Sequence, residues 1–248
     1  MLPASEVERS RRRSAGGFMA ERAAASIGCT SRAVEELIVL GVLNPSPDAV
    51  DNSVPDRKKI EIASFNRLVE HLVRRSASPE SGGFDVSLKR AMWSVGGRLK
   101  PWSATLVALR EGRIPFALLP GAEPLANRLL LRACALPVLQ NLMNGFDDAD
   151  PHFADHMSKS DAFGVLNTKS RVAEGLLERW ESRQGLHRTV PAVEVLRIAK
   201  RFVSRLELAA RAGTTTHRMR GILSRLNVQT RECDLYDRKE AFAALGLG

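Results

Sequence analysis

The 248-residue sequence has few of the residues that build disulfide, metal or catalytic centres. Its three cysteines, Cys29, Cys134 and Cys233, are far apart and lack a CxxC spacing. Neither a disulfide framework nor a zinc site is therefore supported, and we expect buried or incidental thiols in a reducing cytoplasm. The sequence also lacks a glycine-rich phosphate loop, a nucleophile elbow and a separated acidic triad. We therefore predict a protein that is not an enzyme and has no cofactor.

One pair of histidines has a spacing that occurs in metal sites. His152 and His156 are four residues apart, and Asp155 lies between them. The pair falls in an expected linker, and the sequence offers no third ligand at a convincing distance. We therefore predict no metal site.

Long hydrophobic runs are also missing. The N-terminus is polar and rich in arginine, without the apolar core of a signal peptide. The most apolar stretch, residues 114–139, is interrupted by four prolines and by three charged residues. We therefore expect no membrane-spanning helix and no membrane partner.

Positive charge is abundant. Lysine and arginine number 37 against 28 acidic residues, which gives a formal net charge of +9. Such a balance favours a polyanionic partner, most simply nucleic acid, although it also suits membrane surfaces and solvated faces. Placement strengthens the nucleic-acid interpretation, because arginines cluster in the first 17 residues. They are Arg9, Arg11, Arg12 and Arg13.

An internal repeat indicates the fold. The segment SRAVEELI at residues 31–38 is echoed by SRVAEGLL at residues 170–177, and a repeated supersecondary unit decides an architecture. Near the C-terminus a short apolar helix is expected to end at Gly213, a residue suited to a left-handed turn. Thr214 or Thr215 can cap the next helix, whose apolar residues recur every three or four positions. The first copy has the same layout, with a turn at Gly28 and a cap at Thr30 or Ser31, and Asn167 is expected at the turn of the copy around residues 162–177. This pattern is typical of a helix-turn-helix.

A short strand and a closing helix are expected after each helix pair, as in a winged helix-turn-helix. We therefore predict a mainly α fold of three to four tandem winged helix-turn-helix modules with short β-wings. No linker separates the last two modules, so we expect them to pack as a rigid pair. The second module is the most divergent. The predicted organisation is a basic arm at 1–17 and modules at 18–75, 84–143, 156–202 and 203–248.

Helix-turn-helix units present the first turns of their second helix to the major groove of DNA. Arginine can read guanine there, and threonine or histidine can hold phosphates or base edges. The alternative is that these residues are surface positions of structural helices. The tryptophans are expected to be core anchors rather than base-stacking platforms. The candidate DNA contacts are Arg11, Arg12, Arg13, Thr30, Ser31, Arg32, Lys169, Ser170, Arg171, Thr214, Thr215, His217, Arg218, Arg220 and Arg225.

Three segments resemble the C-terminal half of TniQ/TnsD-type transposition proteins. They are MSKSDAFGVLNTKSRVAEGL at 157–176, FVSRLELA at 202–209 with its Gly213-Thr214 turn, and Tyr236-Asp237-Arg238. The resemblance implies serial helix-turn-helix units in a target-selection protein. Such a protein binds attachment-site DNA and recruits an AAA+ transposition regulator and a transposase. The family's N-terminal portion with CxxC zinc motifs is missing here, which suggests a C-terminal fragment or a shortened relative.

We therefore expect a sequence-specific double-stranded DNA-binding protein, cytoplasmic and nucleoid-associated, that selects a target or attachment site in DNA transposition. One alternative is an excisionase- or MerR-like transcriptional regulator or recombination directionality factor, which would use a short, repeated or bent site. An α-helical protein-interaction scaffold is the alternative from another class. Weak binding to any duplex, unchanged on replacing Arg32, Arg171 and Arg218, would favour that scaffold.

Overall fold

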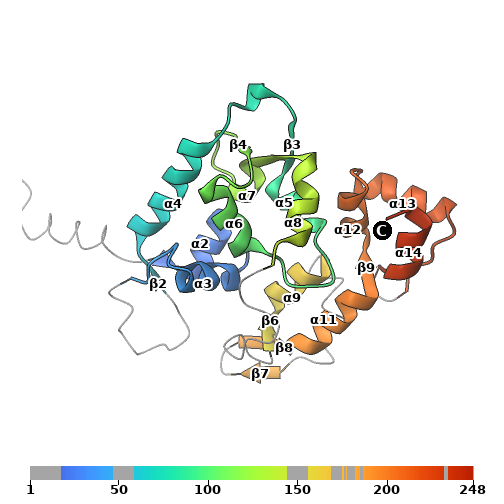
Figure 1. Cartoon of the computed structure of the whole chain (residues 1–248). Coiled ribbons are helices and arrows are strands. Elements are labelled where there is room, and N and C mark those ends of the chain that lie inside the picture. Colours follow the sequence, from blue (N-terminus) through green and yellow to red (C-terminus); the bar gives the residue numbers. More distant parts are fainter. Residues whose placement is uncertain are drawn as a thin grey trace, which may run out of the picture. The chain divides into compact units, whose positions relative to one another are not determined.

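The computed structural model is mainly helical, with small antiparallel sheets (Figure 1). Its contacts divide the chain into two compact units: Met1–Asp85 with Thr105–Arg132, and Val86–Ala104 with Ala133–Gly248. The range expected as a second module, 84–143, is therefore shared between both units. The residues that the structure describes are 18–46, 59–143, 156–168, 175, 177, 182–184, 187–231 and 234–247.

The described part of the first unit consists of helices and two small sheets. The helices and strands that lie in it wholly or in part are β1 (Phe18–Met19), α2 (Ala20–Ile27), α3 (Ser31–Val39), β2 (Lys59–Ile60), α4 (Ile62–Arg75), β3 (Phe84–Ser87), α6 (Trp102–Glu111), β4 (Phe116–Leu118), α7 (Leu125–Arg128) and β5 (Leu129–Arg132). A 3-10 turn, η2, spans Pro79–Ser81. Strand β1 pairs antiparallel with β2, and the second sheet has the order β3-β5-β4.

The second unit consists mostly of short helices that follow strands of three to five residues. It contains α5 (Leu88–Trp93), η3 (Ala133–Ala135), α8 (Leu136–Asn141), β6 (His156–Ser158), α9 (Lys159–Leu166), β7 (Ser182–Gln184), β8 (His187–Pro191), α11 (Ala192–Arg201), β9 (Phe202–Ser204), α12 (Arg205–Arg211), α13 (Thr216–Arg225), β10 (Leu235–Asp237) and α14 (Arg238–Leu245). The strand orders are β6-β8-β7 and β10-β9.

One layout recurs along the chain. A short strand leads into a helix, the helix ends at a left-handed residue, and a later strand pairs antiparallel with the first before a closing helix begins. The strand pairs are β1 with β2, β6 with β8, and β9 with β10. The three turn residues are Gly28, Asn167 and Gly213, with φ of 84°, 53° and 62°. The sequence predicted a turn at each of these positions.

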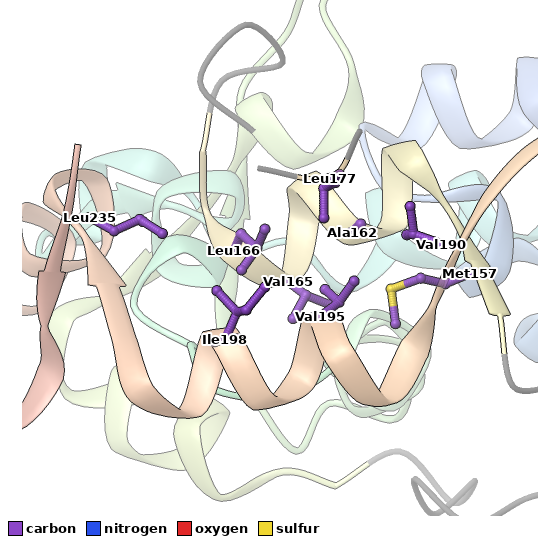
Figure 2. Packing of buried hydrophobic residues seen from close by; sticks show 10 residues of the cluster. Met157, Ala162, Val165, Leu166, Leu177, Val190, Val195, Ile198 and Leu235 are labelled. Carbon is purple, nitrogen blue, oxygen red and sulfur yellow. The ribbon is translucent and has the colours of Figure 1, made fainter. Parts of the chain in front are cut away.

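Two hydrophobic clusters form the core of the C-terminal part. The first joins α9 and α11 through Val165, Val195 and Ile198, and it also takes in Leu235 from β10 (Figure 2). Residues 156–201 and 202–247 therefore share packed side chains. The second cluster lies beneath α13. It contains Val203, Leu208, Ala209, Met219, Leu223, Val228, Tyr236 and Ala241.

Candidate nucleic-acid interface

Helix α13 exposes several cationic side chains. Its ten residues include three arginines, one histidine and no acidic residue. Within the described part of the chain, none of these four side chains takes part in an ion pair or a hydrogen bond. Unpaired arginines gathered on one helix attract polyanions. The four exposed residues are His217, Arg218, Arg220 and Arg225.

The opposite side of α13 is fixed to the protein. Met219 and Leu223 are buried in the cluster shared with α12. The N-terminus of the helix is capped by Thr215, whose Oγ1 accepts a hydrogen bond from the backbone N–H of Arg218 at 3.2 Å. Both Thr214 and Thr215 fit the sequence pattern of a cap, and in the structure the cap is Thr215. Because Met219 and Leu223 are buried, the arginines on the other side of α13 face the solvent.

Thr214 has a different role. Its carbonyl oxygen accepts a hydrogen bond from Arg90 Nη2 at 3.0 Å. Arg90 lies in α5, which packs against α12, and its own backbone N–H is bound by Ser87 Oγ at 3.3 Å. Arg90 thus ties the turn before α13 to a helix more than a hundred residues earlier. No local sequence pattern indicates a contact over that separation, so the role of Arg90 could not be predicted from the sequence.

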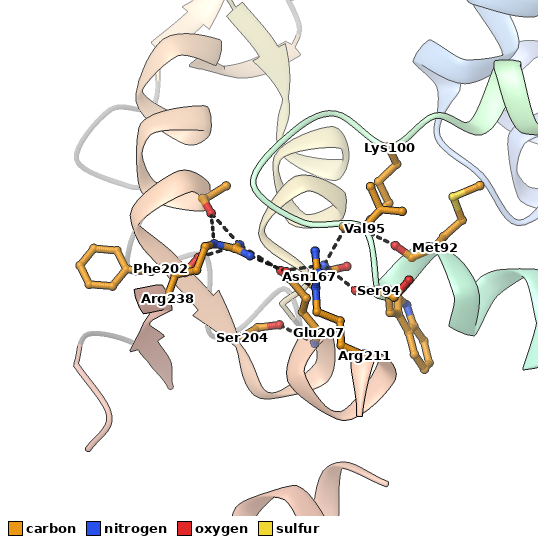
Figure 3. A network of polar contacts seen from close by, with 12 residues as sticks. Met92, Ser94, Val95, Lys100, Asn167, Phe202, Ser204, Glu207, Arg211 and Arg238 are labelled. Atoms are coloured by element: carbon orange, nitrogen blue, oxygen red, sulfur yellow. Dashed lines mark hydrogen bonds and ion pairs between the residues drawn. The ribbon is translucent and has the colours of Figure 1, made fainter. Parts of the chain in front are cut away.

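A buried carboxylate of α12 lies at the centre of a polar network (Figure 3). Glu207 of α12 is only 1% exposed, and its Oε1 lies 2.6 Å from Arg238 Nη1 and 3.2 Å from Arg211 Nε. Its Oε2 accepts from Arg238 Nη2 at 3.1 Å and from Asn167 Nδ2 at 3.4 Å. Ser204 Oγ caps the helix by accepting from the Glu207 N–H at 3.1 Å. The buried charge is therefore compensated from several directions, as such groups must be.

Arg238 extends this network to neighbouring elements. Its Nη2 donates to the carbonyls of Ala199 at 2.7 Å and Phe202 at 3.1 Å. Its guanidinium also lies 5.3 Å from the centre of the Phe242 ring, within the range of a cation–π contact. One side chain thus satisfies carbonyl groups at the end of α11 and in β9 while it neutralises Glu207.

The loop after α5 packs closely on the same carboxylate. A Cβ added to Gly96 would overlap the Glu207 carboxylate, so only glycine fits there without a shift. Asn167 holds this loop from the other side, because its Nδ2 donates to the carbonyls of Trp93 at 3.0 Å and Val95 at 3.2 Å. The left-handed turn after α9 is thereby joined to the 93–97 segment and to α12.

Lys100 also binds the backbone around the end of α5. Its Nζ donates to the carbonyls of Met92 and Val95, both at 2.6 Å. Burial lowers the pKa of Lys100 from 10.5 to about 7, and Glu207 partly opposes this shift while three neighbouring arginines add to it. The network of Glu207, Arg238, Asn167 and Lys100 thus fixes α12, and α13 packs on α12.

The first copy of the layout differs from the last. Arg32, a predicted DNA contact, forms an ion pair with Glu36, in which Arg32 Nε lies 3.2 Å from Glu36 Oε1. The side chains of Arg32 and Glu36 are 12% and 2% exposed. Thr30 Oγ1 caps α3 by accepting from the Ala33 N–H at 3.3 Å. Ser31, also a predicted contact, is half-buried. Arg32 is thus paired within the protein, unlike the exposed arginines of α13, whereas Thr30 and Thr215 have the same capping role.

Helix α6, the second helix of the divergent copy, begins with buried residues. Trp102 is 6% exposed, and Ser103 and Thr105 are fully buried. The first turn of α6 is therefore closed to an external partner. Trp102 lies in the core, as the sequence had indicated.

Several predicted residues lie outside the part of the chain that the structure describes. Of the histidine pair considered for metal binding, only His156 is described, and the described residues contain no group of three or more histidine, cysteine or acidic side chains arranged for a metal ion. The predicted DNA contacts outside the described residues are Arg11, Arg12, Arg13, Lys169, Ser170 and Arg171.

None of the helices described has the length and apolar character needed to cross a membrane. Comparison with protein-family models, with curated proteins and with solved structures finds no match to this chain. Its function is therefore inferred from its own residues.

Proposed function

We propose that this protein binds double-stranded DNA in a sequence-specific manner and that α13 enters the major groove. The observation that carries the proposal is the exposed cationic side of α13, where Arg218, Arg220 and Arg225 lie without an acidic neighbour on their helix. In this proposal residues 203–247 act as a winged helix-turn-helix, with α12 as the supporting helix and α13 as the recognition helix.

The charge of α13 suits this partner. DNA carries a dense row of phosphates, and each arginine that neutralises one of them releases a counterion and adds to the affinity. Arginine can also bind O6 and N7 of guanine in the major groove through two hydrogen bonds. The net charge of +9 adds a favourable long-range attraction.

We further propose that the binding serves selection of a target or attachment site in DNA transposition, with recruitment of an AAA+ regulator and a transposase. This setting is supported by the resemblance of residues 157–176 and 202–209 to TniQ/TnsD-type proteins. In this setting the recurring layout would represent tandem winged helix-turn-helix modules in a cytoplasmic, nucleoid-associated protein.

A second candidate is an excisionase- or MerR-like regulator or directionality factor. It is favoured by the contrast between copies: α13 offers an open cationic surface, whereas Arg32 of α3 is paired and the first turn of α6 is buried. A single open recognition helix would read a short site. The length of the bound site therefore discriminates between the two settings.

The full chain should be tested by selection from random DNA duplexes, followed by titration of the winning duplex against salt. We expect a defined motif, and we expect Arg218→Ala and Arg220→Ala each to reduce the salt slope by about 0.9. The matched control is Arg197→Ala, since Arg197 is an exposed helical arginine already paired with Glu194 at 2.7 Å. Enrichment of no motif, with the same weak binding in all variants, would overturn the proposal and favour a protein-interaction scaffold.

A further inference from the structure

We infer that α13 meets the DNA bases along one line of residues, His217, Gly221 and Ser224, and that Gly221 allows the helix backbone to approach them. The inference deepens the proposed function and rests on it. It assigns base recognition to positions that the arginine pattern alone does not reveal.

The line follows from helix geometry. An α-helix turns by about 100° per residue, so positions i, i+4 and i+7 lie on one side. His217, Gly221 and Ser224 have this spacing, and all three are exposed. Met219 and Leu223, which anchor the helix in the core, lie on the opposite side. The line of three residues is therefore the part of α13 that points farthest from the protein.

Arginines flank the line on both sides. On the same helical geometry, Arg220 falls to one side of it, and Arg218 and Arg225 fall to the other. The major groove is about 12 Å wide and is bordered by the two phosphate backbones. A helix inserted along the line would direct arginines toward both backbones while its centre faces the base edges. This division separates phosphate contacts, which position a protein, from base contacts, which specify a sequence.

Gly221 is the unusual member of the line. Nothing in the described structure lies within 4 Å of a Cβ added at this position, so the fold does not require a glycine there. Glycine inside a helix is also less stable than alanine, because the unfolded chain has more freedom to lose. The missing side chain leaves the middle of the cationic side flat, as close approach of a backbone to a ligand requires.

The neighbouring residues have matching chemistry. Ser224 carries a hydroxyl group that donates and accepts hydrogen bonds, and His217 carries a ring that can do the same at a base edge. We assign sequence discrimination to His217 and Ser224, and phosphate binding to the flanking arginines.

The test compares Gly221→Ala and Gly221→Leu with Ala244→Leu, which adds bulk at an exposed position of α14. The thermal unfolding temperature and the affinities for the selected and an unrelated duplex are measured for each full-length variant. We expect Gly221→Ala to raise the unfolding temperature yet bind the selected duplex several-fold more weakly. Gly221→Leu should weaken binding to the selected duplex more than tenfold, and the salt dependence of binding to unrelated DNA should be unchanged. Ala244→Leu should leave both affinities unchanged.

Selection is then repeated with His217→Ala and Ser224→Ala, which should change the preferred motif, whereas Arg220→Ala should weaken binding to all duplexes alike. Unchanged affinity for the selected duplex in Gly221→Ala and Gly221→Leu would overturn the inference, as would an unchanged motif in both line variants. These results presuppose that the wild-type chain selects a motif. A wild-type chain that selects none would instead overturn the proposed function itself, so the two failures are distinct.

Discussion

Glu207 and Arg238 form a two-point ion pair between α12 and α14. Arg238 Nη1 lies 2.6 Å from Glu207 Oε1, and Nη2 lies 3.1 Å from Oε2, so the guanidinium binds both carboxylate oxygens. Arginine and a carboxylate in this parallel arrangement form one of the stronger charge-assisted contacts in proteins. The pair joins α12 to the first residue of α14. The pair therefore fixes α12, the helix against which α13 packs.

Removing Glu207 should destabilise the protein strongly. We expect Glu207→Ala to lower the free energy of unfolding by about 3–5 kcal/mol, because Arg238 and Arg211 would be left largely buried without a counter-charge. Urea denaturation of the full chain measures the change. Glu194→Ala is the control, since the Glu194–Arg197 pair is largely exposed and such pairs contribute about 1 kcal/mol or less. Equal effects of both substitutions would contradict the role given to Glu207.

Local features of this fold could be predicted from the sequence. The turns at Gly28, Asn167 and Gly213 follow from residue types a few positions apart, because the bonds that form them are equally local. The cap of α3 could be narrowed to Thr30 or Ser31 in the same way, and in the structure it is Thr30. The open choice between Thr214 and Thr215 shows the limit of that approach. Either hydroxyl group could have capped α13.

Contacts across long separations could not be predicted. The hydrogen bond from Arg90 to the Thr214 carbonyl spans 124 positions, and the fit of Gly96 against Glu207 depends on how whole elements pack. The pairing of Arg32 did have a visible signal, because Glu36 follows it by one helical turn. The position of Arg32 at the start of an expected second helix also predicts a DNA contact, so the sequence alone does not decide between an ion pair and a free arginine.

Two substitutions of Asn167 can distinguish the contribution of the left-handed turn to stability from that of the side-chain hydrogen bonds. Its φ of 53° is costly for alanine and free for glycine. Asn167→Gly should lose only the amide contacts, including those to Trp93 and Val95, at about 1–3 kcal/mol. Asn167→Ala should lose the same contacts and a further 1–2 kcal/mol, roughly, for the left-handed backbone. Denaturant unfolding of both variants measures the difference, and equal stabilities would show that the turn conformation contributes little.

Lys100 makes the stability depend on pH. Burial lowers its pKa from 10.5 to about 7 in the folded protein, whereas the unfolded chain keeps the ordinary lysine value. Between these two pH values the unfolded state binds more protons, so stability should rise as pH increases from 7 to 10.5. The slope contributed by one such group reaches about 1.4 kcal/mol per pH unit.

Lys100→Met should remove that contribution, which unfolding midpoints recorded across the same pH range would reveal. The matched control is Lys200→Met, because Lys200 is exposed on α11. We expect the control to keep the wild-type pH profile. A Lys100→Met profile parallel to that of the wild type would show that this ammonium group titrates as an ordinary lysine in the folded protein.

Two arginines in the first turns of α3 and α13 should have opposite effects. Arg32→Ala removes the partner of Glu36, which is 2% exposed, so we expect a loss of about 3 kcal/mol in stability. DNA affinity of the folded fraction should stay unchanged, because Arg32 faces the protein.

Arg218→Ala should alter stability by less than about 0.5 kcal/mol, since the side chain is exposed. Its affinity for DNA and its salt slope should both fall, as one phosphate contact is lost. Denaturation and duplex titration on the same preparations would check both. Weaker DNA binding by Arg32→Ala at unchanged stability would mean that α3 also contacts the duplex, because only a partner outside the protein could then account for the loss.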